Sequence, residues 1–180
     1  MEHNVVIAGF GGQGVMLIGE LLAHAGMDEG KEVTWMPSYG PEQRGGTANC
    51  SVVIADEPIA SPVLTNPQAA IVFNVQSFDK FEPVIEHGGL LILDSTLIEK
   101  KSARSDLSVV YIPATDIALK LGSSKYTNMV LLGAYLGKVA PITMESVHGA
   151  LPIFLTGKKT DLIEVNKRAL QAGVDFVSGN

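Results

Sequence analysis

The segment Gly9-Phe10-Gly11-Gly12-Gln13-Gly14 near the start of the chain matches the pattern G-x-G-x-x-G. A continuous apolar run at residues 5–8 predicts a buried strand before it, and the spacing of apolar residues predicts a helix after it. Glycines permit positive φ and let a phosphate approach main-chain N–H groups, and a helix start adds partial positive charge. The alternative is a glycine turn that only packs the helix against the strand. We expect an anionic group to be bound by Gly9, Gly11, Gly12, Gln13 and Gly14.

A dinucleotide site would also need an acidic residue at the end of the second strand to hold the ribose hydroxyls. That region reads Trp35-Met36-Pro37-Ser38, and the nearest acids, Glu32 and Glu42, lie before the strand end and in the segment beyond it. The glycine segment also lacks the Gly-Lys-Ser/Thr of a P-loop. These observations argue against NAD, FAD and ATP, although a free-standing NAD-dependent dehydrogenase stays open as an alternative.

A second segment, residues 39–46, combines a rigid proline with glycines and follows a short strand that Pro37 is expected to end. Arg44 has the planar donor fork that binds carboxylate or phosphate groups through paired hydrogen bonds. The alternative is a surface loop with a local contact between Glu42 and Arg44. We expect a ligand-binding or interface loop that contains Tyr39, Glu42, Arg44, Gly45 and Gly46.

Other reactive side chains do not form a catalytic or metal-binding set. Cys50 is the only cysteine, which excludes an internal disulfide, a CxxC pair and an iron–sulfur cluster of the chain's own. Its apolar flank predicts a buried, inert thiol. Asp94-Ser95 at a strand end is interpreted as a helix cap rather than a catalytic pair. We therefore expect no catalytic residue and no metal ligand; the histidines lack metal-site spacing and are His3, His24, His87 and His148.

Strands alternate with helices along the whole chain, which is typical of a mostly parallel sheet covered on both faces. We expect an α/β fold of three layers, with a Rossmann-like first βα unit, in a single domain over residues 1–180. Ligands of such sheets bind beyond the carboxyl ends of the strands, which places Gly9 to Gly14 and Asp94 at one edge. The predicted strands are 5–8, 33–36, 50–55, 69–73, 90–93 and 107–112, and the predicted helices are 13–26, one that includes 78–85, 113–122, 128–139, 144–154 and 160–177.

Composition limits the kinds of partner. The formal charge of −6, with no basic stretch, argues against nucleic acid. The N-terminus lacks a signal peptide and no apolar run reaches membrane-spanning length, so we expect a cytoplasmic protein without a membrane partner. The 46% of hydrophobic residues against 18% of charged ones indicates apolar surface covered by another chain, and predicts self-association of the isolated chain.

Four separated segments resemble the gamma subunit of 2-oxoacid:ferredoxin oxidoreductases, and most of all that of the 2-oxoglutarate enzyme. They are GFGGQGV at 9–15, PSYGPEQRGGTANC at 37–50, DEPIASP at 56–62 and NMVLLGAYLG at 128–137. The resemblance covers nearly the whole chain. It implies one subunit of an enzyme that decarboxylates a 2-oxoacid on thiamine diphosphate, passes electrons through iron–sulfur clusters to ferredoxin and releases an acyl-CoA, here succinyl-CoA.

The resemblance further implies partners and a ligand. Thiamine diphosphate is expected between the alpha and beta subunits, and the clusters in a ferredoxin-like delta subunit, which agrees with the single cysteine. Coenzyme A carries phosphates and does not require the ribose-binding acid of NAD, so we expect it at the glycine segment, with Asn128 and the Gln13 amide as further donors. Asn128 is alternatively the N-cap of its own helix. A pyruvate or branched-chain oxoacid enzyme and a structural assembly module remain alternatives, and for Arg44 we expect an interface role.

Overall fold

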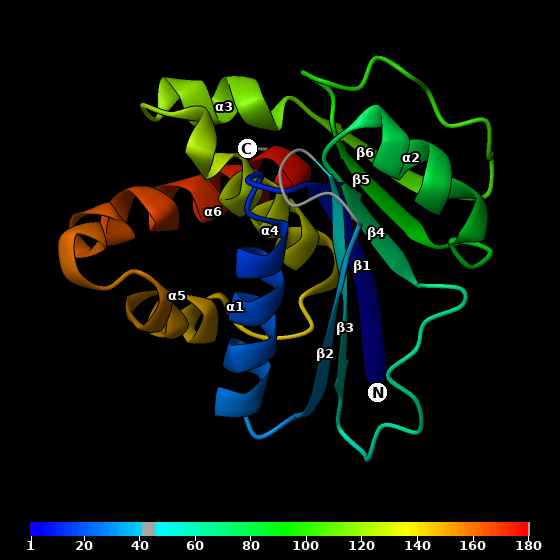
Figure 1. Ribbon diagram of the computed structural model, residues 1–180, viewed down its shortest axis with the longest axis horizontal. Coiled ribbons are helices and arrows are strands. Elements are labelled where there is room, and N and C mark those ends of the chain that lie inside the picture. Colours follow the sequence, from blue (N-terminus) through cyan, green and yellow to red (C-terminus); the bar gives the residue numbers. More distant parts are fainter. Residues whose placement is uncertain (41–45, 180) are drawn as a thin grey trace.

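The computed structural model describes residues 1–40 and 46–179, and one six-stranded sheet runs through it in the order β2-β3-β1-β4-β5-β6 (Figure 1). β1, β4, β5 and β6 pair in parallel, whereas β3 lies antiparallel between β1 and β2. The expected mostly parallel α/β sheet is confirmed. The strands are β1 (Glu2–Phe10), β2 (Glu32–Tyr39), β3 (Thr47–Ala55), β4 (Ala69–Val72), β5 (Leu90–Asp94) and β6 (Ser108–Ile112).

Helices cover both faces of the sheet (Figure 1). On one face α1 and α4 pack against the strands, and α4 is in turn covered by α6; on the other face lies α2. The helices are α1 (Val15–Asp28), α2 (Val75–Phe81), α3 (Ala114–Lys120), α4 (Thr127–Val139), α5 (Met144–Phe154) and α6 (Ile163–Ser178), and the 3₁₀ turns are η1 (Glu82–Val84), η2 (Ser124–Tyr126) and η3 (Gly157–Leu162). In the described part of the chain, no helix combines the length and the apolar character that crossing a bilayer requires.

The apolar run of β1 is buried on both sides, as its sequence predicts. Val5 and Ile7 belong to the core between the sheet and the helices α1 and α4, and Val6 belongs to the smaller core beneath α2. Successive side chains of a strand point to opposite faces, so a strand covered on both faces must be apolar throughout. β1 is therefore a central strand, and its carboxyl end at Phe10 leads directly into the glycine segment.

The prediction that Pro37 ends the second strand is wrong, because β2 continues to Tyr39. Pro37 pairs in register with Cys50 of β3, and β2 is the edge strand of the sheet that the described residues form. A proline cannot donate a ladder hydrogen bond, but an edge strand needs such donors on one side only. The loop between β2 and β3 is thus shorter than the sequence indicates, and its ends lie at the carboxyl end of β1.

Two predicted helices differ most from the observed bounds. α2 ends at Phe81, and η1 carries the chain on to Ile85, because Pro83 cannot supply a donor to a continuing α-helix. The last helix begins at Ile163, after the 3₁₀ turns of η3, rather than at residue 160.

α4 and α6 approach each other closely where Gly133 faces Gly173. A Cβ atom at Gly173 would lie 2.6 Å from the nitrogen of Ala134 and would also overlap the carbonyl oxygen of Val130. A Cβ atom at Gly133 would overlap the carbonyl of Leu170. These neighbours are main-chain atoms that cannot turn aside, so the helix spacing requires glycine at both positions.

Gly173→Ala is expected to destabilise the protein by about 1–3 kcal/mol, the usual effect of an overfilled contact. The measurement is the midpoint of urea unfolding followed by circular dichroism. Gly149→Ala in α5 is the matched control, because nothing lies within 4 Å of its Cβ position. That control is expected to stabilise by roughly 1 kcal/mol through helix propensity. Equal stability of the two variants would contradict the close α4–α6 contact.

Candidate functional site

The glycine segment forms the turn between β1 and α1, at the carboxyl edge of the parallel strands. Gly14 occupies the N-cap position of α1 with φ of 78°, in the left-handed region. A Cβ atom at Gly14 would also overlap the side-chain amide of Asn128. Both the backbone conformation and the space therefore require glycine there. Gly12 has φ of 94°, but nothing lies within 4 Å of its Cβ position, so that side of the turn is open.

Main-chain hydrogen bonds divide the four amides of this turn into two pairs. The Gly11 N–H donates to the Gly46 carbonyl at 3.0 Å, and the Gln13 N–H donates to the Phe10 carbonyl at 3.1 Å. Among the described residues, the amides of Gly12 and Gly14 have no acceptor. α1 also has no side-chain cap and no acidic residue in its first turn. Of the residues expected to bind an anionic group, Gly11 and Gln13 thus use their amides within the protein. Gly12, Gly14 and the start of α1 stay candidates for contact with a ligand.

The side chains of Gln13 and Asn128 stabilise the turn through hydrogen bonds. The Gln13 Oε1 accepts from the Phe10 N–H at 2.6 Å and from the Asn74 side-chain amide at 3.3 Å. The buried Asn128 donates through Nδ2 to the Gly14 carbonyl at 3.3 Å. The N-cap of α4 is Tyr126, so the alternative that Asn128 caps its own helix is wrong.

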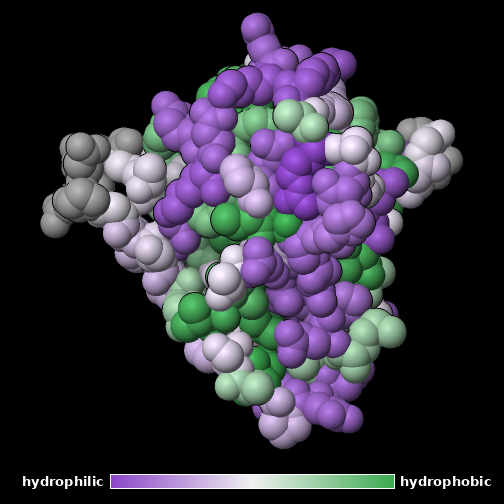
Figure 2. Space-filling view, turned by 90° about the vertical axis from the view of Figure 1, so that its right-hand side faces the viewer, coloured by the Kyte–Doolittle hydropathy of each residue, from purple (hydrophilic) through white to green (hydrophobic). Residues whose placement is uncertain are grey.

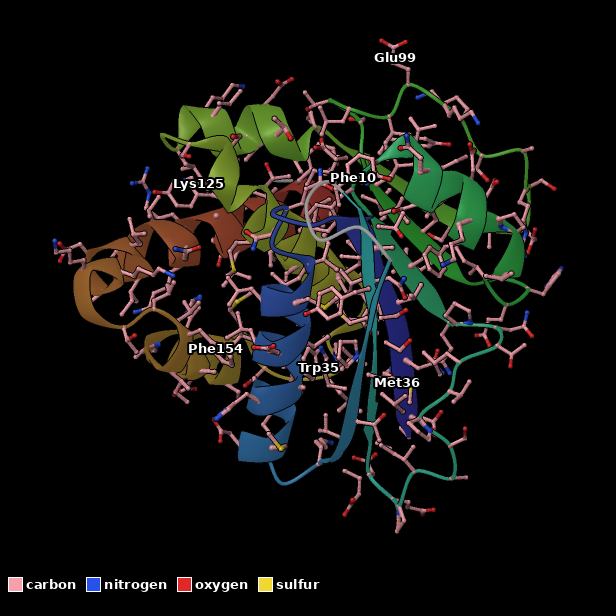
Figure 3. All side chains as sticks on the ribbon, in the orientation of Figure 1. Phe10, Trp35, Met36, Glu99, Lys125 and Phe154 are labelled. Atoms are coloured by element: carbon pink, nitrogen blue, oxygen red, sulfur yellow. The ribbon has the colours of Figure 1, made fainter. Side chains whose placement is uncertain are left out.

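A cleft of about 640 Å³ opens beside Gly12 and Gly14. Its size lies within the range of about 300–1,000 Å³ that is usual for small-molecule sites. Figure 3 labels Lys125, which comes from η2 just before α4 and borders this cleft. Its walls come from separate parts of the chain and consist of Gly12, Gln13, Gly14, Leu17, Phe73, Leu97, Thr115, Ser124, Lys125, Thr127, Asn128 and Lys159.

A buried carboxylate supports the hydroxyl groups of the cleft. Asp94, at the end of β5, accepts from the Thr115 hydroxyl at 2.5 Å and from the Thr115 N–H at 3.2 Å. The Thr115 hydroxyl lies 3.3 Å from that of Thr127. Asp94 therefore caps the start of α3, whereas the residues directly after it, including Ser95, form a turn and not a helix. Its carboxylate holds the Thr115 hydroxyl in place, whereas the Thr127 hydroxyl donates to the Ser124 carbonyl at 2.7 Å.

The predicted interface loop is described only at its two ends. Tyr39 is exposed at the end of β2, and the buried Gly46 contacts the glycine turn through its carbonyl. Glu42, Arg44 and Gly45 lie outside the described residues, so their expected role stays a prediction. The two segments singled out in the sequence nevertheless meet, because the bond between Gly11 and Gly46 joins them.

Comparison with known proteins identifies the family. The family model described as pyruvate ferredoxin/flavodoxin oxidoreductase matches residues 4–176. The chain belongs to this family. Ketoisovalerate oxidoreductase subunit VorA of Methanothermobacter marburgensis is 37% identical over 99% of the chain, which spans only 37% of that relative's length. The 2-oxoglutarate synthase subunit KorC of Methanocaldococcus jannaschii is 34% identical over 84% of the chain and 82% of its own length.

Solved structures of family members share the fold. The gamma subunit of keto/oxoacid ferredoxin oxidoreductase from Geobacter sulfurreducens superposes with a TM-score of 0.85 at 26% identity, and 99% of each chain is covered. The 2-oxoglutarate:ferredoxin oxidoreductase from Magnetococcus marinus, solved with 2-oxoglutarate, coenzyme A and succinyl-CoA bound, gives a TM-score of 0.91 at 22% identity, with 99% of this chain and 31% of that one covered. At that identity the second match concerns the fold alone.

Most of the side chains that line the cleft are not marked by any motif in the sequence. In the sequence, Leu17 and Phe73 belong to a predicted helix and a predicted strand, and nothing marks Leu97 as a site residue. Lys125 and Lys159 lie in short 3₁₀ turns that carry no motif. The one usable signal was the rule that ligands bind at the carboxyl edge of parallel strands, which points to the residues after β4 and β5. Within the described ranges, no group of three or more His, Cys, Asp or Glu side chains is placed to hold a metal ion.

Cys50 lies in β3 under the first turn of α1 and is fully buried. Its Sγ is 3.7 Å from the Val15 carbonyl, and burial raises the pKa of the thiol to about 12. We expect the native protein to resist thiol reagents at pH 8, where only about 10⁻⁴ of the groups would be ionised at that pKa. The measurement is reaction with Ellman's reagent before and after addition of guanidinium chloride. Fast labelling of the native protein would contradict this burial.

Proposed function

We propose that the chain is the gamma subunit of a multi-subunit 2-oxoacid:ferredoxin oxidoreductase and supplies its coenzyme A site. It would act as one domain over residues 1–180, with alpha, beta and ferredoxin-like delta subunits as partners and ferredoxin as the electron acceptor, in the cytoplasm. The single observation that carries the coenzyme A site is the cleft beside Gly12 and Gly14, where two amides that have no acceptor among the described residues lie at an uncapped helix start. Main-chain donors in this arrangement suit a diphosphate.

Sheet topology favours coenzyme A over NAD for this site. In dinucleotide-binding folds, the second strand lies beside the first and brings an acidic residue to the ribose. Here β3 separates β2 from β1, and Glu32 stands at the start of β2, away from the carboxyl edge. A ligand in the cleft therefore meets no ribose-binding carboxylate from β2. The Magnetococcus enzyme was solved with coenzyme A bound, which agrees with this choice of ligand.

In this proposal, the partner subunits bind the remaining cofactors. The lone Cys50 is buried and cannot provide the thiolates that an iron–sulfur cluster needs. Thiamine diphosphate supplies the decarboxylation chemistry and would bind between the alpha and beta subunits. The residues of this chain bind and orient the acyl acceptor, and none of them is assigned a catalytic role.

2-Oxoglutarate is the proposed substrate, because KorC matches this chain over most of its own length as a separate subunit. A branched-chain 2-oxoacid is the second candidate, since identity to the ketoisovalerate subunit VorA is higher, at 37%. The assembled enzyme, assayed for ferredoxin reduction with each oxoacid in turn, distinguishes them. A higher kcat/KM for 2-oxoglutarate is the expected result.

Apolar surface supports the proposed association with other chains. A groove of about 270 Å³ beside α1 is lined by residues that include Met27, Trp35 and Phe154. In Figure 3, Trp35 and Phe154 lie on opposite sides of α1, and the exposed Met36 lies close by on β2. Figure 2 shows the side of the molecule that carries α2. Hydrophilic residues cover most of this surface and divide its hydrophobic residues into several small patches. Partner subunits, or a second copy when the chain is isolated, would cover the groove.

Gly12→Leu tests the coenzyme A site directly. The new side chain would enter the open space beside Gly12, so we expect the KM for coenzyme A in the assembled enzyme to rise by at least about tenfold, equivalent to about 1.4 kcal/mol. The KM for the oxoacid should be unchanged. The readout is ferredoxin reduction at saturating oxoacid with coenzyme A varied.

The matched control is Gly30→Leu, after α1. Gly30 also has a positive φ, of 74°, and free space around its Cβ position, but it lies outside the cleft. This variant carries a similar backbone strain and should leave the KM for coenzyme A unaltered. An unchanged KM in the Gly12→Leu enzyme, with the protein folded, would remove the proposed site.

A further inference from the structure

We propose that Lys125 and Lys159 recognise the 3′-phosphate of coenzyme A, so that this chain selects coenzyme A over its 3′-dephospho form. The inference rests on the proposed function, and it assigns a second anion-binding point in the same cleft. Lys125 belongs to η2, and Lys159 belongs to η3, so neither is part of the glycine turn.

Two lysines give the lining of the cleft a positive charge, and the carboxylate of Asp94 is buried behind Thr115. The lining includes two lysines and no carboxylate, in a chain with 19 acidic and 13 basic residues. Three other hollows of the described surface differ in this respect, since Glu29, Asp56 and Glu20 each line one of them. A positive lining in an acidic protein attracts an anionic ligand and would be disfavoured in its absence by mutual repulsion.

The two lysines are also free of ion pairs within the described residues. Lys31, Lys100 and Lys167 each lie within 4 Å of a carboxylate, and Arg104 pairs with Asp106. Lys125 and Lys159 have no such partner in that part of the chain, and both are exposed. Their ammonium groups are therefore available to a ligand without loss of an existing interaction.

The cleft is lined by apolar, hydroxyl and cationic side chains. Leu17, Phe73 and Leu97 form apolar wall from α1 and from the segments that follow β4 and β5. Thr115 and Thr127 supply hydroxyl groups, and the lysines come from the 3₁₀ turns. A ligand that fills this space has an apolar or planar part and more than one anionic group.

Coenzyme A meets this requirement, and its two kinds of phosphate match two kinds of donor. The diphosphate suits main-chain amides at Gly12 and Gly14, which approach it closely. The ribose 3′-phosphate is a separate dianion that suits flexible ammonium groups. NAD and dephospho-coenzyme A carry the diphosphate alone, so the lysines would distinguish coenzyme A from both.

The test compares coenzyme A with 3′-dephospho-coenzyme A as acyl acceptors of the assembled enzyme. Wild-type enzyme is expected to have a KM about tenfold or more lower for coenzyme A, the effect of charge-assisted hydrogen bonds to one phosphate. In the Lys125→Gln/Lys159→Gln double variant, the KM for coenzyme A should rise to that of the dephospho form. The KM for the dephospho form itself should stay within about twofold of the wild-type value.

Lys138→Gln is the matched control, because Lys138 is an exposed lysine at the other end of α4 and lies outside the cleft. It should keep the full preference for coenzyme A. Replacement of both cleft lysines by arginine, which keeps the charge, should also retain most of the preference.

Two results would overturn the inference while leaving the proposed function intact. One is an equal KM for both acceptors in the wild-type enzyme. The other is a double variant that weakens both acceptors equally, which would place the lysines on the diphosphate. Failure of the proposed function has a different signature, since the KM for coenzyme A would then be unchanged both by Gly12→Leu and by the loss of the two lysines.

Discussion

Gly14 cannot be replaced by a residue with a side chain without strain or steric overlap. The backbone there is left-handed, and the amide of Asn128 fills the space that a Cβ atom would need. This contact joins the start of α1 to the start of α4, and α1 has no side-chain cap among the described residues. Asn128 also lines the cleft together with Gly12 and Gly14, so the contact fixes one wall of that cleft. The proposed coenzyme A site depends on this one constraint.

The antiparallel strand β3 changes what the glycine motif can bind. It inserts between β1 and β2, and the carbonyl of Gly46, just before β3, accepts a hydrogen bond from the Gly11 amide. One amide of the motif is thus occupied by the protein itself, and the second strand is too far along the sheet to contribute a ribose-binding acid. The G-x-G-x-x-G pattern therefore lacks the strand arrangement of a dinucleotide site, while phosphate binding by its free amides stays a proposal.

Much of the fold can be predicted from the sequence, because the buried strands are apolar runs and the helices have regular apolar spacing. The antiparallel direction of β3 and the passage of β2 through Pro37 depend on the order of strands in the sheet, which no local pattern contains. The same holds for the site: the glycines form a recognisable motif, whereas Lys125 and Lys159 become neighbours of that motif only through the packing of α4 and α6. Asn128 was singled out by resemblance, but its bond to Gly14 is a tertiary contact.

The most direct test of this account is a structure of the assembled enzyme with coenzyme A bound to it. The account predicts diphosphate oxygens within about 2.7–3.2 Å of the amide nitrogens of Gly12 and Gly14, the range of N–H···O hydrogen bonds. The Gly11 amide should still donate to Gly46. Coenzyme A bound elsewhere, with the cleft beside Gly12 and Gly14 containing only water, would contradict it.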